Sequence, residues 1–251
     1  MTTSFYKVGI LLVSWVLLGS TQRFTPTEIL KKMEAHTRGD KMYSEFTMQI
    51  ERPRYTREMQ MKSWAMGTDF SLILVTQPAR ERGIAYLKRY KEIWNYVPTI
   101  DRLIKLPPSM MSQSWMGSDL SNDDLVRESS LIDDYTHALV GRDTLLGYAC
   151  YKLELVPKPN RPIVWSKVWI WIAETHFFQL KAVQFDERGD QVNTLLYSDV
   201  KQLGGRMMPA KLELIPLQKR GQKTVLIQNA VDFNPAISEE FFSIQNLKNV
   251  R

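Results

Sequence analysis

HFFQLKAVQFDERGDQVNTLLYSDV, residues 176–200, is the stretch that decides the fold. On both sides of its short turn, ERGD at residues 187–190, apolar and polar side chains tend to alternate. A period of two is typical of a half-buried strand, because successive side chains of a strand point to opposite faces of the sheet. Two such strands joined by a short turn predict an antiparallel hairpin.

The same pattern recurs along most of the chain. Further strands are predicted at residues 42–51, 57–67, 69–75, 83–90, 92–98, 102–106, 135–140, 148–156, 163–174, 206–217 and 222–233. Roughly a dozen strands joined by short turns such as ERGD and KRGQ predict one long antiparallel meander in a mainly β fold. So much sheet must curl, split or close, and a strongly curved sheet with helices over its mouth satisfies that need.

One helix precedes the strands. Thr25 is expected as its N-cap, Pro26 as its first residue and Gly39 as its stop. One face of this helix is apolar through Ile29, Leu30 and Met33. The chain shows no internal repeat and no Pro/Gly/Ser linker long enough to mark a boundary, so residues 21–251 are predicted to form a single domain.

Residues 1–20 have the pattern of a secretory signal peptide. Lys7 precedes the apolar run VGILLVSWVLL, residues 8–18, which is too short to span a bilayer, and small residues follow it. Cleavage there lowers the formal net charge from +6 to +5 and predicts a soluble protein in the periplasm. An uncleaved anchor is the alternative, since a leucine falls where the signal peptidase prefers a small residue. A mildly basic exported protein more often meets anionic lipid headgroups than nucleic acid.

The acidic stretch SWMGSDLSNDDL, residues 114–125, resembles the start of a calcium loop. However, Asp124 stands where that loop needs a glycine, and Ser130 stands where it needs a bidentate glutamate. A helix start explains the stretch better: Ser121 is the N-cap and Asp124, three residues later, caps it reciprocally. We therefore expect a structural cap here and no metal.

Catalytic motifs are missing from the sequence. The three histidines, His36, His137 and His176, form no helical metal motif, and no GxSxG, GxxxxGK[ST] or GxGxxG stretch occurs. The single cysteine, Cys150, lies within a strand pattern and cannot form an internal disulfide. We expect no catalytic residue and no cofactor.

The apolar surface is rich in tryptophan and methionine. Within VWSKVWIWI, Trp165, Trp169 and Trp171 share one strand face, and Val168, Ile170 and Ile172 share the other, so both faces need cover. Methionine side chains are unbranched thioethers, which adapt to irregular or changing partners. These residues either fill a large core or line a site for flexible hydrocarbon, and as a group they favour the second interpretation.

Four stretches carry a family resemblance. They are PTEILKKMEAHTRGD (26–40), YSEFTMQIERP (43–53), IWNYVPTIDRLIKLPPSMMSQSWMGSDLSNDDL (93–125) and EEFFSIQNL (239–247). In this order, after an export signal, they resemble the outer-membrane lipoprotein-sorting proteins of the LolA-like superfamily over nearly the whole mature chain. The resemblance implies an incomplete, half-open antiparallel β-barrel of roughly 11 strands, with a lid of short α-helices over an apolar cavity. Such carriers shield acyl chains in the periplasm and pass them from an inner-membrane transporter to an outer-membrane acceptor.

This resemblance assigns provisional roles to residues. The lid is expected from the first helix and residues 110–125, including Met110, Trp115 and Met116. In better-known carriers a strand arginine holds the lid, and Arg57 is the nearest candidate by order. The lipid-contacting concave face is expected to include Met48, Ile50, Met59, Met61, Phe70, Leu72, Trp94, Tyr96 and Trp169.

Three functions remain open from the sequence. The leading one is a periplasmic carrier that binds lipid or lipoprotein acyl chains, with transporter and acceptor partners and no nucleic acid. The second is a lipid-sensing or accessory subunit of an envelope transporter, which an exposed face at residues 169–172 would favour. The third, a hydrolase, lacks a nucleophile or an acid pair. The headgroup of the cargo stays undetermined.

Overall fold

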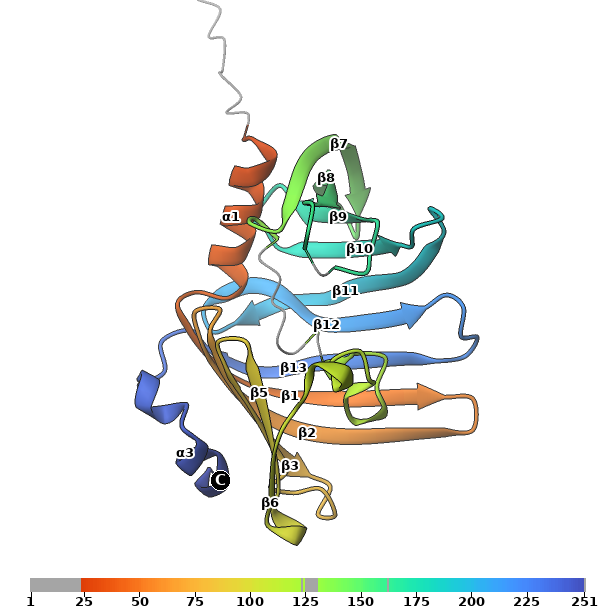
Figure 1. The fold of residues 1–251 in the computed structure, drawn as a ribbon. Coiled ribbons are helices and arrows are strands. Elements are labelled where there is room, and N and C mark those ends of the chain that lie inside the picture. The colour runs from red at the N-terminus through yellow and green to blue at the C-terminus, as the bar shows by residue number, and fades with distance from the viewer. Residues whose placement is uncertain (1–23, 123, 125–130, 162, 251) are drawn as a thin grey trace, which may run out of the picture.

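The computed structural model describes residues 24–122, 124, 131–161 and 163–250 (Figure 1). The predicted signal peptide, residues 1–20, and Leu125 at the end of the expected lid lie outside these residues. None of the helices among the described residues combines the length and the hydropathy of a transmembrane helix.

A single open antiparallel sheet of thirteen strands forms the body of the protein, in the order β6-β5-β4-β3-β2-β1-β13-β12-β11-β10-β9-β8-β7. The mainly β, half-open barrel with a helical lid is therefore confirmed, with more strands than expected. Every predicted strand stretch overlaps an observed strand, although several strands extend beyond the predicted ends. Their bounds are β1 Lys41–Arg52, β2 Tyr55–Met66, β3 Phe70–Gln77, β4 Ala85–Arg89, β5 Glu92–Val97, β6 Arg102–Lys105, β7 Tyr135–Leu145, β8 Tyr148–Pro157, β9 Lys167–Ala173, β10 Gln179–Phe185, β11 Gln191–Leu203, β12 Arg206–Pro216 and β13 Lys223–Asp232.

The strands form two meanders rather than the single one predicted. β1 to β6 run outward to one edge of the sheet, β7 to β13 run back from the other edge, and the β1–β13 pair joins the two halves. Local turn signals could not reveal this pairing because β1 and β13 lie far apart in sequence. As a consequence, the chain between β6 and β7 must pass from one edge of the sheet to the other.

Helix α1, Pro26–Thr37, begins as the sequence predicts. The Thr25 side chain accepts a hydrogen bond from the Glu28 backbone N–H, and the Glu28 carboxylate accepts one from the Thr25 N–H at 2.7 Å. Its three predicted apolar residues are buried against β7, β8, β9 and β10, in a cluster that includes Leu153, Ile170 and Ala182. Gly39 follows the helix with a φ of +67°, a conformation that glycine adopts without strain.

The strand register separates two faces of the sheet. Met48 lies opposite Met59 and Leu226, Leu226 lies opposite Leu212, and Leu212 lies opposite Tyr197. Directly opposed residues share a face, and the same face continues through Leu195, Ala182, Ile170 and Leu153. We call this the inner face, because α1 packs on one half of it and part of the β6–β7 connection packs on the other (Figure 1).

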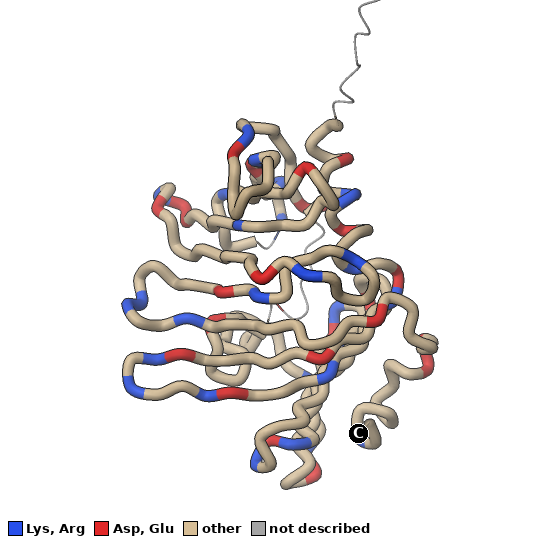
Figure 2. The backbone as a smooth tube through the Cα atoms, turned by 180° about the vertical axis from the view of Figure 1, so that it is seen from behind, with Lys and Arg blue, Asp and Glu red and all other residues tan. Residues whose placement is uncertain are grey.

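The opposite side, the outer face, has a different cover. Residues 237–250, which include the 3-10 turn Glu239–Phe241 and helix α3 (Ile244–Asn249), pack on β3 and β4 through Ile237, Phe242, Leu247 and Val250. We call this segment the C-terminal cover. Along the chain as a whole, basic and acidic residues are interspersed over the strands and turns (Figure 2).

Candidate functional site

The inner face carries a short covering segment from the β6–β7 connection, residues 108–122, which we call the lid segment. It contains the 3-10 turns Pro108–Met110 and Trp115–Gly117. Trp115 is its apolar anchor: the side chain is 1% exposed and its ring packs edge-on against Tyr86, with centroids 5.7 Å apart. The residues buried with Trp115 are Met48, Ile50, Met59, Met61 and Val75.

Short-range hydrogen bonds hold the tip of the lid segment in a compact turn. The Trp115 N–H donates to the Leu120 carbonyl at 2.7 Å, and the Ser118 N–H donates to the Trp115 carbonyl at 2.9 Å. Met116 and Gly117 have φ values of 52° and 80°, so the turn uses the left-handed region at two successive residues. Because these bonds lie within the segment, the tip can move as a unit without losing them.

Two arginines from the β1–β2 hairpin bind the tip of the lid segment to the sheet. Arg57 donates from Nη1 to the Met116 carbonyl at 2.9 Å, and Arg52 donates from Nη2 to the Gly117 carbonyl at 2.8 Å. Arg52 also forms an ion pair with Asp119 at 3.0 Å, and its side chain is 11% exposed. The contact predicted for Arg57 by order in the sequence is therefore present in the geometry, whereas Arg52 was missed.

Asp119 completes this set of polar contacts, which we call the latch. Its carboxylate accepts from Thr224 Oγ1 at 2.8 Å, and its backbone N–H donates to the same oxygen at 2.8 Å. The latch residues are Arg52, Arg57, Asp119 and Thr224. The two residues joined by each of these hydrogen bonds lie 59 to 105 positions apart in the sequence. Sequence spacing therefore gave no signal for Arg52 or Thr224.

Two acidic residues of the stretch around the latch, Asp119 and Asp124, are held by contacts within the described part of the chain. The Asp119 side chain is 3% exposed and is paired with Arg52. Ser121 and Asp124 form the reciprocal hydrogen bonds of a capping box: the Ser121 N–H donates to the Asp124 carboxylate at 2.7 Å, and the Asp124 N–H donates to Ser121 Oγ at 3.1 Å. Among the described residues, no group of three His, Cys, Asp or Glu side chains is placed to hold a metal.

Between α1 and the lid segment, the inner face remains apolar but is less tightly covered. Leu195, Tyr197, Leu212 and Leu226 are all half-buried there. We call these four residues the inner strip. Leu195 contacts the cluster under α1, and Leu226 contacts the cluster under the lid segment, so the strip connects the two. Burial raises the pKa of Tyr197 to about 12.

The structure divides the nine predicted lipid-contacting residues between the two faces. Met48, Ile50, Met59 and Met61 lie on the inner face beneath Trp115. Phe70, Leu72, Trp94, Tyr96 and Trp169 lie on the outer face, because their strand partners are the residues that alternate with the inner set. Their expected position on the concave face is therefore corrected. The sequence could not decide it, since these strands are apolar on both sides.

The outer five have their own cover. Phe70 and Leu72 are buried beneath the C-terminal cover, with Trp94 and Tyr96 packed at the border of that cluster. Trp169 lies under lysines instead: Lys152 Nζ is 3.9 Å from its ring centroid, and Lys167 Nζ is 5.0 Å away. The neighbouring Trp171 is only 5% exposed.

Two histidines have structural hydrogen bonds near α1. A His36 ring nitrogen lies 2.8 Å from the Met207 carbonyl, and a His137 ring nitrogen lies 2.7 Å from the Leu131 carbonyl. Both therefore help to fasten α1 and the chain near it to the sheet. The inner face therefore offers a ligand an apolar surface beneath the lid segment, which a few polar contacts hold in place.

Comparisons with known proteins agree with this architecture. A family model with the description "Uncharacterized protein" matches residues 67–249. A comparison with curated proteins gave no significant match.

Solved structures share the fold over most of the chain. A DUF1329 family protein from Desulfovibrio piger is 24% identical, with a TM-score of 0.80 over 88% of this chain and 97% of that one. An outer membrane lipoprotein-sorting protein domain from Vibrio parahaemolyticus is 21% identical, with a TM-score of 0.77 over 89% and 98%. A LolA superfamily protein from Nitrosomonas europaea is 22% identical, with a TM-score of 0.73 over 89% and 100%. At these identities the likeness shows a common fold.

Proposed function

We propose a carrier function for this chain, which belongs to the family whose model matches residues 67–249 and has the LolA-like fold. In this proposal the protein works in the periplasm, binds lipid acyl chains on its inner face and delivers them towards the outer membrane. The name of the Vibrio parahaemolyticus structure, an outer membrane lipoprotein-sorting protein domain, supports lipoproteins as the cargo. An inner-membrane transporter and an outer-membrane acceptor are the partners that this role requires.

One observation carries the proposal: the lid segment closes over a continuous apolar face but is held by only a few polar contacts. Trp115 is its buried apolar anchor, and the latch supplies the other contacts to the strands. Opening would expose Met48, Ile50, Met59 and Met61, and these residues would then extend the inner strip into one long apolar surface. A closed protein would thus stay soluble, and an open one would offer a surface that matches a hydrocarbon chain.

The energies favour loading. Each sheltered methylene contributes about 0.8 kcal/mol, so about ten of them contribute about 8 kcal/mol. Each latch hydrogen bond contributes about 1–3 kcal/mol net, with the bonds of the Arg52–Asp119 pair at the upper end, because water replaces it on opening. The Trp115 ring loses its burial on opening, but the acyl chain takes its place against the same residues. A partly sheltered chain therefore offsets the cost of opening.

The outer face gives less support to a sensing role. An exposed apolar face at residues 169–172 would have favoured that role. Instead, lysine side chains cover the Trp169 ring, and Trp171 is buried beside it. A carrier, which spends part of its cycle free in solution, needs an outer face shielded in this way.

The cargo can be identified directly. The protein is purified from the periplasm of its own host and measured by native mass spectrometry, followed by lipid extraction. A bound acylated species near a one-to-one ratio is the expected result. Protein that arrives empty and does not take up a fluorescent fatty acid would overturn the carrier function.

A matched pair of substitutions then tests the face. Leu212 and Leu196 are both half-buried leucines on neighbouring central strands, but Leu212 lies on the inner face and Leu196 on the outer face. Leu212→Asn should weaken fatty-acid uptake about tenfold through lost apolar contact, whereas Leu196→Asn should leave it unchanged. Circular dichroism verifies that both variants remain folded. Equal uptake by the two variants would contradict an inner-face site.

A further inference from the structure

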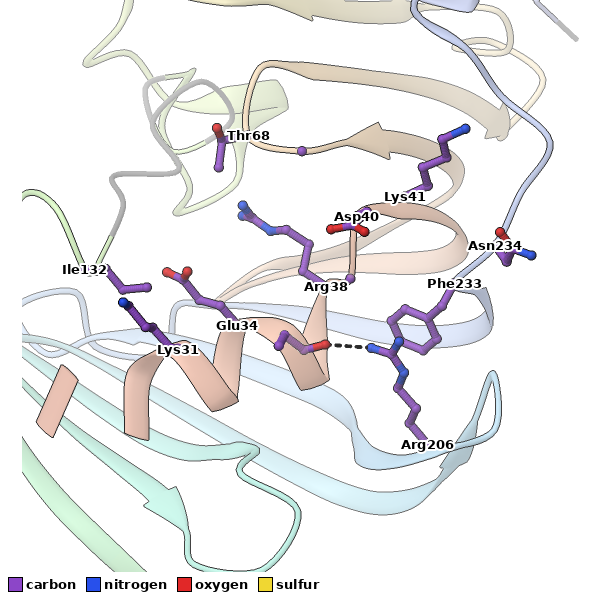
Figure 3. Close-up of a pocket in the computed structure, with 13 residues that line it drawn as sticks. Lys31, Glu34, Arg38, Asp40, Lys41, Thr68, Ile132, Arg206, Phe233 and Asn234 are labelled. Carbon is purple, nitrogen blue, oxygen red and sulfur yellow. Dashed lines mark hydrogen bonds between the residues drawn. The ribbon is translucent and has the colours of Figure 1, made fainter. Parts of the chain in front are cut away.

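A second concave site lies at the end of the sheet where α1 stops, at the opposite end of β1 from Arg52 and the latch (Figure 3). We call it the rim pocket; its volume is about 720 Å³, within the range of small-molecule sites. Five separate parts of the chain meet there: the end of α1 with the residues that follow it, the β2–β3 turn, the chain before β7, the start of β12 and the chain after β13. Its lining residues are Lys31, Glu34, Ala35, Arg38, Gly39, Asp40, Lys41, Gly67, Thr68, Ile132, Arg206, Phe233 and Asn234.

Positive charge dominates the rim pocket. Four basic side chains line it, against two acidic ones. In Figure 3, Arg38 extends from the end of α1 towards Thr68, and Arg206 lies against Phe233. A concave site with an excess of positive charge attracts anions, because its low-dielectric walls concentrate the field.

Arg206 is held in place before any ligand arrives. Its Nη1 donates to the Ala35 carbonyl at 2.9 Å and to the His36 carbonyl at 2.8 Å, and its guanidinium carbon lies 3.8 Å from the Phe233 ring centroid. Its Nη2 and Nε make no hydrogen bond to any residue that the structure describes. A fixed guanidinium with donors to spare is suited to phosphate oxygens, which it can bind in a bidentate way.

The same contacts remove an obstacle to anion binding. The C-terminal end of a helix carries partial negative charge on its last carbonyls, which would repel an anion. Arg206 covers two of these carbonyls at the end of α1. Gly39 follows these carbonyls with a φ of +67°, and a Cβ there would make ordinary van der Waals contact with Arg206 Nη2 at 3.5 Å.

The rim pocket also borders the apolar interior. Ile132 lines the pocket and packs against the cluster beneath α1, the cluster that the inner strip joins through Leu195. A ligand with an anionic group in the rim pocket could therefore extend its apolar part along the inner face. This geometry fits a molecule with one phosphate and attached hydrocarbon.

The charges and the placement of the rim pocket lead us to propose that it binds a phosphate group, either on the headgroup of a phospholipid or as free phosphate. Binding of a phospholipid headgroup rests on the proposed carrier function and would specify its cargo. Binding of free phosphate does not depend on that function. Arg206 would be the fixed donor, and Lys31 and Arg38 would add positive charge, whereas Lys41 donates to the Ile237 carbonyl.

Three probes separate these sources: dimyristoyl phosphatidic acid, dimyristoyl glycerol with the same chains but no phosphate, and inorganic phosphate alone. Binding of each to the purified protein is measured by isothermal titration calorimetry at low ionic strength. Phosphatidic acid should bind about tenfold more tightly than the diacylglycerol. The double variant K31Q/R38Q should remove most of that preference and leave diacylglycerol binding unchanged.

Two further variants keep the test specific. K219Q/R220Q removes one lysine and one arginine from the exposed β12–β13 turn and should keep the full preference. Thr68→Glu adds a negative charge to the exposed pocket wall and should lower phosphate binding without removing any basic group.

Each outcome decides between the hypotheses. Preference for phosphatidic acid without binding of inorganic phosphate assigns the site to a headgroup, whereas equal binding of phosphate alone assigns it to the free anion. If both lipids bind equally and K31Q/R38Q changes nothing, the rim pocket proposal is overturned while the carrier function stands. If neither lipid binds but phosphate does, the carrier function fails and the anion site stands.

Discussion

The lid segment and the C-terminal cover do the same task on opposite faces of one sheet, but they are attached differently. The lid segment has one deeply buried apolar anchor, Trp115, and a latch of charged and polar contacts. The C-terminal cover buries four apolar side chains, Ile237, Phe242, Leu247 and Val250, against β3 and β4. Polar contacts support it as well: Lys41 Nζ and Arg89 Nη1 donate to the Ile237 and Phe242 carbonyls, and Arg89 and Lys248 pair with Glu239 and Asp101, so the difference lies in the number of buried apolar side chains.

This difference separates a removable cover from a permanent one. Water can replace polar contacts when a segment lifts, so their loss costs little, whereas each apolar side chain that leaves its cluster exposes surface to water. The C-terminal cover should therefore open only with global unfolding, and the lid segment should open while the sheet stays folded. The comparison places the moving part of the proposed carrier on the inner face.

The largest effect should come from the C-terminal cover. Phe242→Ala leaves a cavity at a fully buried site and should lower the free energy of unfolding by about 3–5 kcal/mol in urea denaturation. Ile244→Ala, at a side chain 37% exposed in the same segment, should change it by less than about 1 kcal/mol. Equal effects of the two substitutions would show that the cover is not anchored as described.

Trp115→Ala should act locally. Lost packing under the ring should favour lid opening by up to about 3 kcal/mol, which corresponds to roughly hundredfold faster hydrogen exchange at residues 108–122. Exchange in β1 and α3 should stay the same. If the midpoint of global unfolding fell as far as in Phe242→Ala, the lid segment would be part of the permanent core and the comparison would fail.

The latch should contribute less than the Trp115 anchor. Arg52→Gln leaves the buried Asp119 carboxylate without its ion pair and should favour opening by about 2 kcal/mol; Arg57→Gln, which leaves no such charge on the lid segment, should favour it by about 1 kcal/mol. Stopped-flow uptake of a fluorescent fatty acid should be fastest in Arg52→Gln, intermediate in Arg57→Gln and slowest in the unchanged protein. Arg54→Gln, at an exposed position on the same hairpin, is the control and should not change the rate.

The smallest effect should appear at alkaline pH. Burial raises the pKa of Tyr86, beneath Trp115, from 10.0 to about 12. Opening the lid should return this pKa towards 10, so the closed state holds the proton more tightly and closure should weaken as pH rises from 10 towards 12. Tyr86→Phe should remove that pH dependence from exchange in the lid segment, while Tyr43→Phe, whose ring packs on Trp64 near the C-terminal cover, should not.

Strand patterns and the family resemblance together predicted the open barrel, and local signals predicted α1 with its cap. Period-two alternation is a short-range property, so it located the strands but could not assign their faces. Met48 and Leu72 have the same apolar character, and only the register across β1, β2 and β3 places them on opposite sides. The same limit explains the single predicted meander, since the β1–β13 pairing is long-range.

In the candidate site, too, contacts between distant parts of the chain could not be predicted from local sequence. The resemblance implied Trp115 in the lid and Arg57 as the nearest arginine by order, and the structure places Arg57 Nη1 2.9 Å from the Met116 carbonyl of the lid segment. Thr224 carries no sequence signal, because a lone threonine in a strand is ordinary until folding places it 2.8 Å from the Asp119 backbone N–H. The inner strip was missed because Leu195, Tyr197, Leu212 and Leu226 belong to three strands that are no more apolar than their neighbours.

The central claim is that acyl chains bind on the inner face beneath the lid segment. The most direct test is cross-linking with a fatty acid that carries a photoreactive diazirine near its chain end, followed by peptide mapping with mass spectrometry. We expect labels on the inner strip and on residues 108–122, and competition by unlabelled fatty acid. Labels confined to the outer face around Trp169 or to the C-terminal cover would contradict the claim.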